Sequence, residues 1–196
     1  MRRRSVLRLA GLLGVVLVTG GHTPYRQWQV YRRRHLLIGT SRSDPPSYAL
    51  GKRIVEVLLE HLPESSARVT RGPDPWRLAS LLTTAQLDVV LLSEDDASAL
   101  RDGHPPFEAF GPTELRALFR AGDHLLITRP DFPDRHAWRV AGTLTTQASL
   151  LPEAAPAGPE EPVPVHPGAL AFAAGEPLPA GTEIASEDEG GPDHVH

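Results

Sequence analysis

The sequence contains no cysteine, which excludes disulfide bonds, thiolate metal sites and a cysteine nucleophile. It also lacks the G-x-S-x-G elbow, the Walker loop, the H-E-x-x-H zinc motif and the dinucleotide-binding glycine fingerprint. One acid and one base are adjacent at Asp123-His124, but neighbouring residues of a strand point to opposite faces. We therefore expect neither an enzyme nor a cofactor.

Positive charge is absent from the last part of the chain. Residues 140–196 carry nine acidic residues and no Lys or Arg, whereas residues 1–34 carry eight Arg and no acid. The net charge of −4 leaves −3 for residues 35–139. Because this central region has no excess of positive charge to neutralise phosphates, nucleic acid is not an expected partner.

The N-terminus resembles an export signal. Basic residues precede the apolar stretch LAGLLGVVLVTGG, which has the length of a signal peptide and is short for a membrane span. The order Arg3-Arg4-Ser5-Val6-Leu7-Arg8 is similar to a twin-arginine motif, and Sec export is the alternative. We expect residues 1–34 to be a signal peptide or membrane anchor with a basic flank. This places the protein in the periplasm, or on the inner membrane facing it.

Short apolar runs and helical patterns alternate over residues 35–146. The expected strands are 35–40, 67–70, 87–92, 115–119 and 124–128. The expected helices are 47–62, capped by Ser47 and stopped by Pro63, then 74–85, capped by Asp74, and 94–100. This order predicts an α/β domain built on a parallel sheet with right-handed crossovers.

Residues 147–196 form a tail rich in proline and acidic residues. Segment 151–196 holds nine of the 20 prolines and no Lys or Arg, so we expect the tail to be largely disordered. Residues 163–173, VPVHPGALAFA, are apolar enough to dock on the domain. His166 and the terminal Asp193-His194-Val195-His196 raise a metal-binding alternative, but no third ligand has a defined spacing, and we expect no metal site.

Polar side chains follow two of the expected strands, where ligands bind in parallel α/β sheets. The expected ligand-binding residues are Thr40, Ser41, Arg42, Ser47, Tyr48 and Ser93. The start of the helix near Ser47 would favour an anion through its unpaired amides. The alternative is that Ser41, Ser47 and Ser93 are ordinary turn formers or helix caps.

Four stretches of the sequence resemble, in the same order, segments of one protein family. They are IGTSRSDPPSYALG at 38–51, LDVVLLS at 87–93, GHPPF with LRAL between 103 and 118, and VHPGAL at 165–170. The family segments are a GTG-rich loop with YYPLG, A-D-L-A-L-V-Q-S, GPF with LRAL, and H-P-G-A. The chain is thus similar to the TAXI-type (TRAP-associated extracytoplasmic immunogenic) solute-binding proteins of TRAP transporters.

The resemblance implies exported two-lobed proteins that close on organic acids, such as dicarboxylates or glutamate-like amino acids, and deliver them to a membrane permease. This chain departs from the family in two ways. Between Thr143 and His166 there is no room for a second lobe of about 100 residues. The loop has lost its glycines: Pro45 and Pro46 have no N–H to offer, and Asp44 would repel a carboxylate, although Arg42 could bind one.

We therefore expect a single α/β lobe resembling lobe one of a type II periplasmic solute-binding protein. It would bind a small organic acid or glutamate-like ligand weakly and serve a TRAP-type permease. A homodimer of two lobes would restore the missing ligand burial. The alternative function is a non-transport interaction or accessory module built on a degenerate binding lobe.

Overall fold

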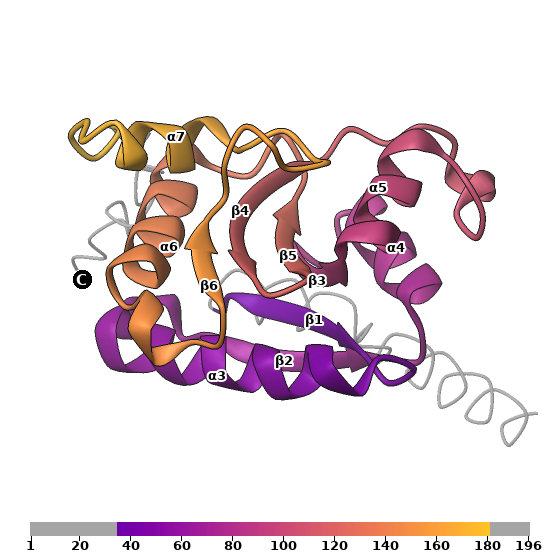
Figure 1. Ribbon diagram of the computed structural model, residues 1–196, viewed down its shortest axis with the longest axis horizontal. Coiled ribbons are helices and arrows are strands. Elements are labelled where there is room, and N and C mark those ends of the chain that lie inside the picture. The colour runs from indigo at the N-terminus through magenta and orange to yellow at the C-terminus, as the bar shows by residue number, and fades with distance from the viewer. Residues whose placement is uncertain (1–34, 181–196) are drawn as a thin grey trace, which may run out of the picture. The chain divides into compact units, whose positions relative to one another are not determined.

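The computed structural model describes residues 35–180 (Figure 1). The expected signal or anchor at 1–34 and the histidines at 194 and 196 lie outside the described residues. Within residues 35–180, no helix has both the length and the apolar character that a membrane span requires.

A six-stranded mixed sheet organises residues 35–180, with the strand order β2-β1-β3-β5-β4-β6. The strands are β1 (Leu37–Ser41), β2 (Arg68–Gly72), β3 (Val89–Ser93), β4 (Arg116–Ala121), β5 (His124–Thr128) and β6 (Ala154–Pro156). Strand β1 runs parallel to β2 and β3, whereas β5 is antiparallel to β3 and β4, and β6 is antiparallel to β4. The expected parallel sheet is therefore wrong in its second half. Only Gly122 and Asp123 separate β4 from β5, and so short a connection joins antiparallel strands.

Helices cover both faces of this sheet. They are α3 (Pro45–His61), α4 (Pro75–Thr83), α5 (Glu94–Asp102), α6 (Asp134–Thr146) and α7 (Pro167–Ala173), with short 3₁₀ turns η1 (Pro63–Ser65), η2 (Glu108–Phe110) and η3 (Ala148–Leu150). Asp74 caps α4 as expected, since its Oδ1 accepts a hydrogen bond from the Arg77 amide at 2.7 Å. The expected cap of α3 is wrong: Asp44 holds the N-cap position, and Pro45 and Pro46 occupy the first turn, where proline's fixed φ suits a helix.

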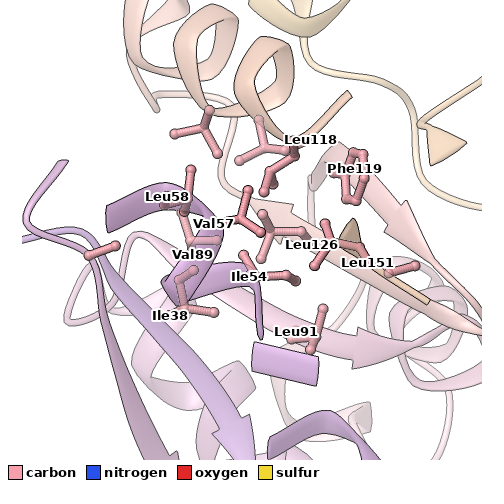
Figure 2. Close-up of a cluster of buried hydrophobic side chains, with 14 of the residues drawn as sticks. Ile38, Ile54, Val57, Leu58, Val89, Leu91, Leu118, Phe119, Leu126 and Leu151 are labelled. Carbon is pink, nitrogen blue, oxygen red and sulfur yellow. The ribbon is translucent and has the colours of Figure 1, made fainter. Parts of the chain in front are cut away.

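Strand β3 divides the apolar core into two parts. Val89 and Leu91 pack into a cluster with α3 and α6, shown in Figure 2, whereas Val90 and Leu92 pack into a second cluster with α4 and α5. All four side chains are buried, as expected for a strand covered on both faces. The nearly continuous apolar run LDVVLL therefore correctly predicted a central strand.

The expected disorder of the tail is wrong for residues 147–162, whereas residues 163–173 dock on the domain as expected. Strand β6 pairs with β4, and α7 lies against α6 at the upper left of Figure 1. The contacts explain how a proline-rich segment is held, because Leu151, Val163 and Ala169 are buried. The segment also receives hydrogen bonds from the sheet, including one from the Ala117 amide to Pro164 O at 2.8 Å.

His166 fixes the start of α7. Its Nε2–H donates to Phe132 O at 2.9 Å, and its Nδ1 accepts from the Gly168 amide at 3.1 Å. Burial lowers the pKa of His166, and the neutral ring is the form that both bonds require. Because both nitrogens are engaged inside the fold, His166 is not available as a metal ligand.

Candidate functional site

The loop between β1 and α3 is closed by its own hydroxyl groups. Ser47 is buried; its Oγ accepts from the Ser41 amide at 3.2 Å and donates to Asp44 O at 2.8 Å. Ser41 Oγ lies 2.9 Å from Ser43 Oγ and accepts from the Ser43 amide at 3.2 Å. The serines expected to bind a ligand thus hold the loop in shape, which corresponds to the turn-former alternative.

Thr40 is also engaged inside the protein. Its hydroxyl donates to Thr70 O on the neighbouring strand at 3.1 Å, and the residue is buried. Its methyl group lies against Gly51 of α3, where an added Cβ would sit 2.6 Å from Thr40 Cγ2. Gly51 therefore permits the close approach of α3 to β1, and Thr40 supports that contact.

The other three candidate residues lie apart from one another. Ser93 caps α5, since its Oγ accepts from the Asp96 amide at 3.2 Å. Tyr48 faces β2, with the Arg71 guanidinium 4.1 Å from its ring centroid. Arg42 is exposed, and its amide donates to Gly72 O at 3.0 Å. Of the six candidate side chains, only those of Arg42 and Tyr48 are not held by a hydrogen bond within residues 35–180.

A cluster missed from the sequence lies at the same edge of the sheet. His124, at the start of β5, is 4% exposed. Its Nε2 is 2.7 Å from Asp44 Oδ2, and its Nδ1 is 2.6 Å from Asp123 Oδ1. The expectation that Asp123 and His124 point apart is wrong because Asp123 lies in the turn, outside β5. Asp44 and His124 are 80 positions apart, so no local motif could reveal their contact.

This cluster limits the chemistry available at the edge. An imidazole has two nitrogens, and it can donate to two carboxylates only when both carry a proton. With both nitrogens facing carboxylates, His124 is not placed to accept a proton from a nucleophile, as the base of a Ser-His-Asp triad does. The cluster instead ties the β1–α3 loop to the β4–β5 turn.

Carboxylates dominate the surroundings of His124. Burial raises the pKa of Asp96, and the nearby charges of Asp44 and Asp95 raise it further, against the Ser93 hydrogen bond that lowers it. The first turn of α5 consists of Glu94, Asp95 and Asp96. The first turn of α3 contains two prolines without N–H groups. This edge therefore offers an anion few donors and several repelling charges.

Two open cavities flank α3. The first, of about 340 Å³, lies between α3 and the β4–β5 turn; its lining includes Leu50, Arg53, Asp123, His124 and Glu153. Arg53 is engaged there by Glu56 at 2.7 Å and by Leu150 O at 3.2 Å.

The second cavity, of about 540 Å³, lies between α3 and β2, and we call it the β2 groove. Its lining residues include Tyr48, Lys52, Val55, Leu59, Arg68 and Val69. Tyr48 therefore belongs to the β2 side of α3, away from Ser93.

Comparison of the sequence with known proteins does not assign it to a family. No protein-family model matches the chain, and no curated protein matches it either. The function is therefore argued from the residues and their contacts.

Proposed function

We propose that the chain is an extracytoplasmic TAXI-like solute-binding lobe of a TRAP-type transport system, which binds a small organic acid or glutamate-like ligand weakly. One observation carries the proposal: two segments that bear the resemblance separately meet in space. The Ala117 amide of the LRAL segment donates to Pro164 O, and the His166 amide of the HPGA segment donates to Ala117 O at 2.9 Å. This contact supports a lobe in which the C-terminal element belongs directly to the same sheet, beside β4.

The arrangement of the strands gives further support. Gly39 of β1 pairs with Val90 of β3, so Ser41 and Ser93 end neighbouring parallel strands at one edge, where α/β sheets bind ligands. At this edge Arg42 carries an exposed guanidinium with no ion pair within the described residues, and a guanidinium binds a carboxylate well.

The same geometry limits the expected affinity. Pockets gain affinity by burying most of the ligand surface, and residues 35–180 contain no second lobe that faces this one to complete the burial. Asp44 and Asp96 lie at the same edge, so their charges oppose an anionic ligand. We expect dissociation constants of about 1 mM or weaker for succinate and glutamate.

The test is an NMR titration of the purified protein with succinate and with glutamate. Arg42→Ala should abolish the chemical-shift changes, whereas Arg77→Ala, which removes another exposed guanidinium, should leave them intact. Micromolar affinity would contradict the weak-binding proposal. Absence of any response at 50 mM of either ligand would contradict solute binding altogether.

Location and assembly are tested separately. A reporter that is active only outside the cytoplasm, fused after residue 34, should be active if residues 1–34 direct export. Light scattering should show whether the lobes associate in pairs, as the proposed homodimer requires. An inactive reporter would contradict the extracytoplasmic location.

The second candidate is an interaction or accessory module, and the self-bonded loop favours it. The hydroxyls of Ser41 and Ser47 bond within the loop, which leaves little capacity for a solute. If this function is correct, the double variant Arg42→Ala, Tyr48→Ala should lose the chemical-shift changes with succinate and glutamate, yet retain in a pull-down the protein partner that the unaltered chain retains. Loss of both activities in that variant would contradict it.

A further inference from the structure

The β2 groove combines an open strand edge with an apolar lining, two features that favour the binding of an extended segment. Strand β2 lies at the end of the sheet order and pairs only with β1 among the described strands. The groove beside it is lined by Val55 and by Leu59, whose exposed fraction is 46%. An open strand edge beside an apolar groove is the usual receptor for an added extended segment.

The free hydrogen-bonding groups of this edge can be identified from the register. The Arg68 amide donates to Leu36 O at 2.9 Å, and Gly72 O accepts from the Arg42 amide at 3.0 Å. Because the direction of hydrogen bonding alternates along a strand, Thr70 also faces β1, and the backbone groups of Val69 and Arg71 face outward. These outward groups have no partner within residues 35–180.

Three cations surround the free edge. Lys52 and Arg68 line the groove, and Arg71 lies over the Tyr48 ring. None of the three forms an ion pair with a carboxylate in the described part of the chain, whereas the nearby Arg53 is paired with Glu56 at 2.7 Å. The groove therefore fits a segment that is extended and acidic.

We propose that residues 181–196 of the same chain bind in the β2 groove, with their backbone beside β2 and their carboxylates near Lys52, Arg68 and Arg71. This segment carries five acidic residues and no Lys or Arg. It includes the stretch TEIASEDE at 182–189, in which Ile184 can contact the apolar floor. The proposal does not rest on solute binding by Arg42 in the β1–α3 loop.

The path of the chain makes this segment a near neighbour of the groove. Glu176, just after α7, accepts a hydrogen bond through its backbone O from Trp138 Nε1 at 3.1 Å. The next residue of α6, Arg139, bonds to Glu64 of η1 at 2.6 Å. Pro63, the first residue of η1, and Ser66, the residue after it, line the groove. Beyond Ala180, ten extended residues can reach about 33 Å.

Charge selects this occupant over a second copy of the chain. Pairing two β2 strands would bring two sets of Lys52, Arg68 and Arg71 together, and like charges across a strand pair are destabilising. An acidic segment of another protein would satisfy the same chemistry. The chain's own segment has the advantage of its tether, which gives an effective concentration of about 1 mM.

The test compares amide hydrogen exchange, measured by NMR, in the full chain and in a chain ending at Ala180. With a tethered concentration of about 1 mM, an intrinsic dissociation constant of about 0.1 mM slows exchange about tenfold. We expect this protection at Val69 and Arg71 in the full chain and its loss in the shortened chain. Thr70, which faces β1, is the internal reference and should exchange slowly in both.

A second variant keeps the full chain length. Replacing the five acidic residues of 181–196 by Asn and Gln should remove the protection, as should the triple variant Lys52→Glu, Arg68→Glu, Arg71→Glu. The control Arg77→Glu changes an exposed charge outside the groove and should leave protection unchanged. Added peptide 181–196 should restore protection to the shortened chain.

Three outcomes would overturn the proposal. Equal exchange at Val69 and Arg71 with and without residues 181–196 would do so. Protection that grows with protein concentration, together with a doubled mass, would identify a second copy as the occupant. Protection that appears only after an acidic protein from another source is added would assign the groove to that partner.

Discussion

Two regions on either side of α3 use polar residues in opposite ways. In the β1–α3 loop, the hydroxyls of Ser41 and Ser43 bond to each other, and the hydroxyl of Ser47 bonds to the backbone. In the β2 groove, Lys52, Arg68 and Arg71 have no carboxylate partner within residues 35–180, and the backbone of β2 is open. The residue types of the loop made it the expected binding site. The groove, however, has more charged side chains and backbone groups that lack a partner within residues 35–180.

The difference follows from side-chain length. Serine is short and reaches the backbone of its own turn, so it readily satisfies local groups. Lysine and arginine carry their charge on long stems into solvent and require a distant partner. A site is therefore better recognised by the hydrogen-bonding and ionic capacity that the fold leaves unused than by the number of polar residues in a motif.

The largest expected effect comes from Gly51→Val, which should break both regions together. Gly51 lies between the loop and the groove on α3, and an added Cβ would meet Thr40 Cγ2 at 2.6 Å. Overpacking of this kind costs about 1–3 kcal/mol of unfolding free energy. Urea denaturation measures the loss. Ala49→Val, an exposed change on the same helix, is the control and should cost about 0.5 kcal/mol; equal costs would contradict the close approach.

Ser47→Ala should open the loop and leave the groove intact. The change removes the acceptor of the Ser41 amide inside a buried site, and an unsatisfied buried donor costs about 1–3 kcal/mol. The free energy of unfolding and the exchange rate of the Ser41 amide both report the effect. Ser43→Ala, on an exposed residue of the same loop, should cost less. Similar losses in the two variants would show that the loop is not held by Ser47.

Asp96→Asn should change how the free energy of unfolding depends on pH. The pKa of Asp96 is raised mainly by burial, so the folded state binds this proton more tightly than the unfolded chain. The charged form then costs stability at pH values above the folded pKa, and the cost disappears as the pH falls through it. The variant should be more stable than the wild type at pH 7, by a margin that shrinks in acid.

The exposed Asp95→Asn is the matched control for that experiment. It should show a smaller margin, because its carboxylate stays in solvent. If the Asp96→Asn margin grows in acid, the pKa of Asp96 is lowered in the fold and the assignment is wrong.

The smallest expected effect is that of Tyr48→Leu on the groove side. It removes the ring beneath the Arg71 guanidinium, at 4.1 Å, and exposed cation–π contacts contribute about 0.5–1 kcal/mol. A double-mutant cycle with Arg71→Ala measures the coupling by denaturation. A coupling near zero would mean that the Arg71 guanidinium gains nothing from the ring.

The first half of the fold could be predicted because each element carries its own signal. The apolar run before Ser93 is long enough to identify a buried strand, and Asp74-Pro75 is a local helix start. The antiparallel direction of β5 relative to β4 follows from the two-residue turn between them, a local signal that the expected parallel sheet overlooked. The pairing of β5 with β3 is different, because it is set by the fold as a whole and has no signal in either five-residue segment.

The tail and the site show the same limit. Residues 147–180 contain few aliphatic side chains, but Val163 and Leu151 are buried against elements distant in sequence, and composition alone cannot show this. The positions of Thr40, Ser41 and Ser93 at strand ends were predicted from pattern. Whether their hydroxyls remain available depends on partners such as Thr70 O, which only the pairing of β1 with β2 supplies.

The two edges of the sheet differ in a way that limits polymerisation. Strand β6 closes one side with three residues and ends in Pro156, which has no amide to donate, whereas β2 presents five residues on the other. Filaments built by strand addition need two unpaired strand edges on each molecule. Among the described strands this lobe has one, so any association of copies through β2 would stop at a pair and would not extend into fibres.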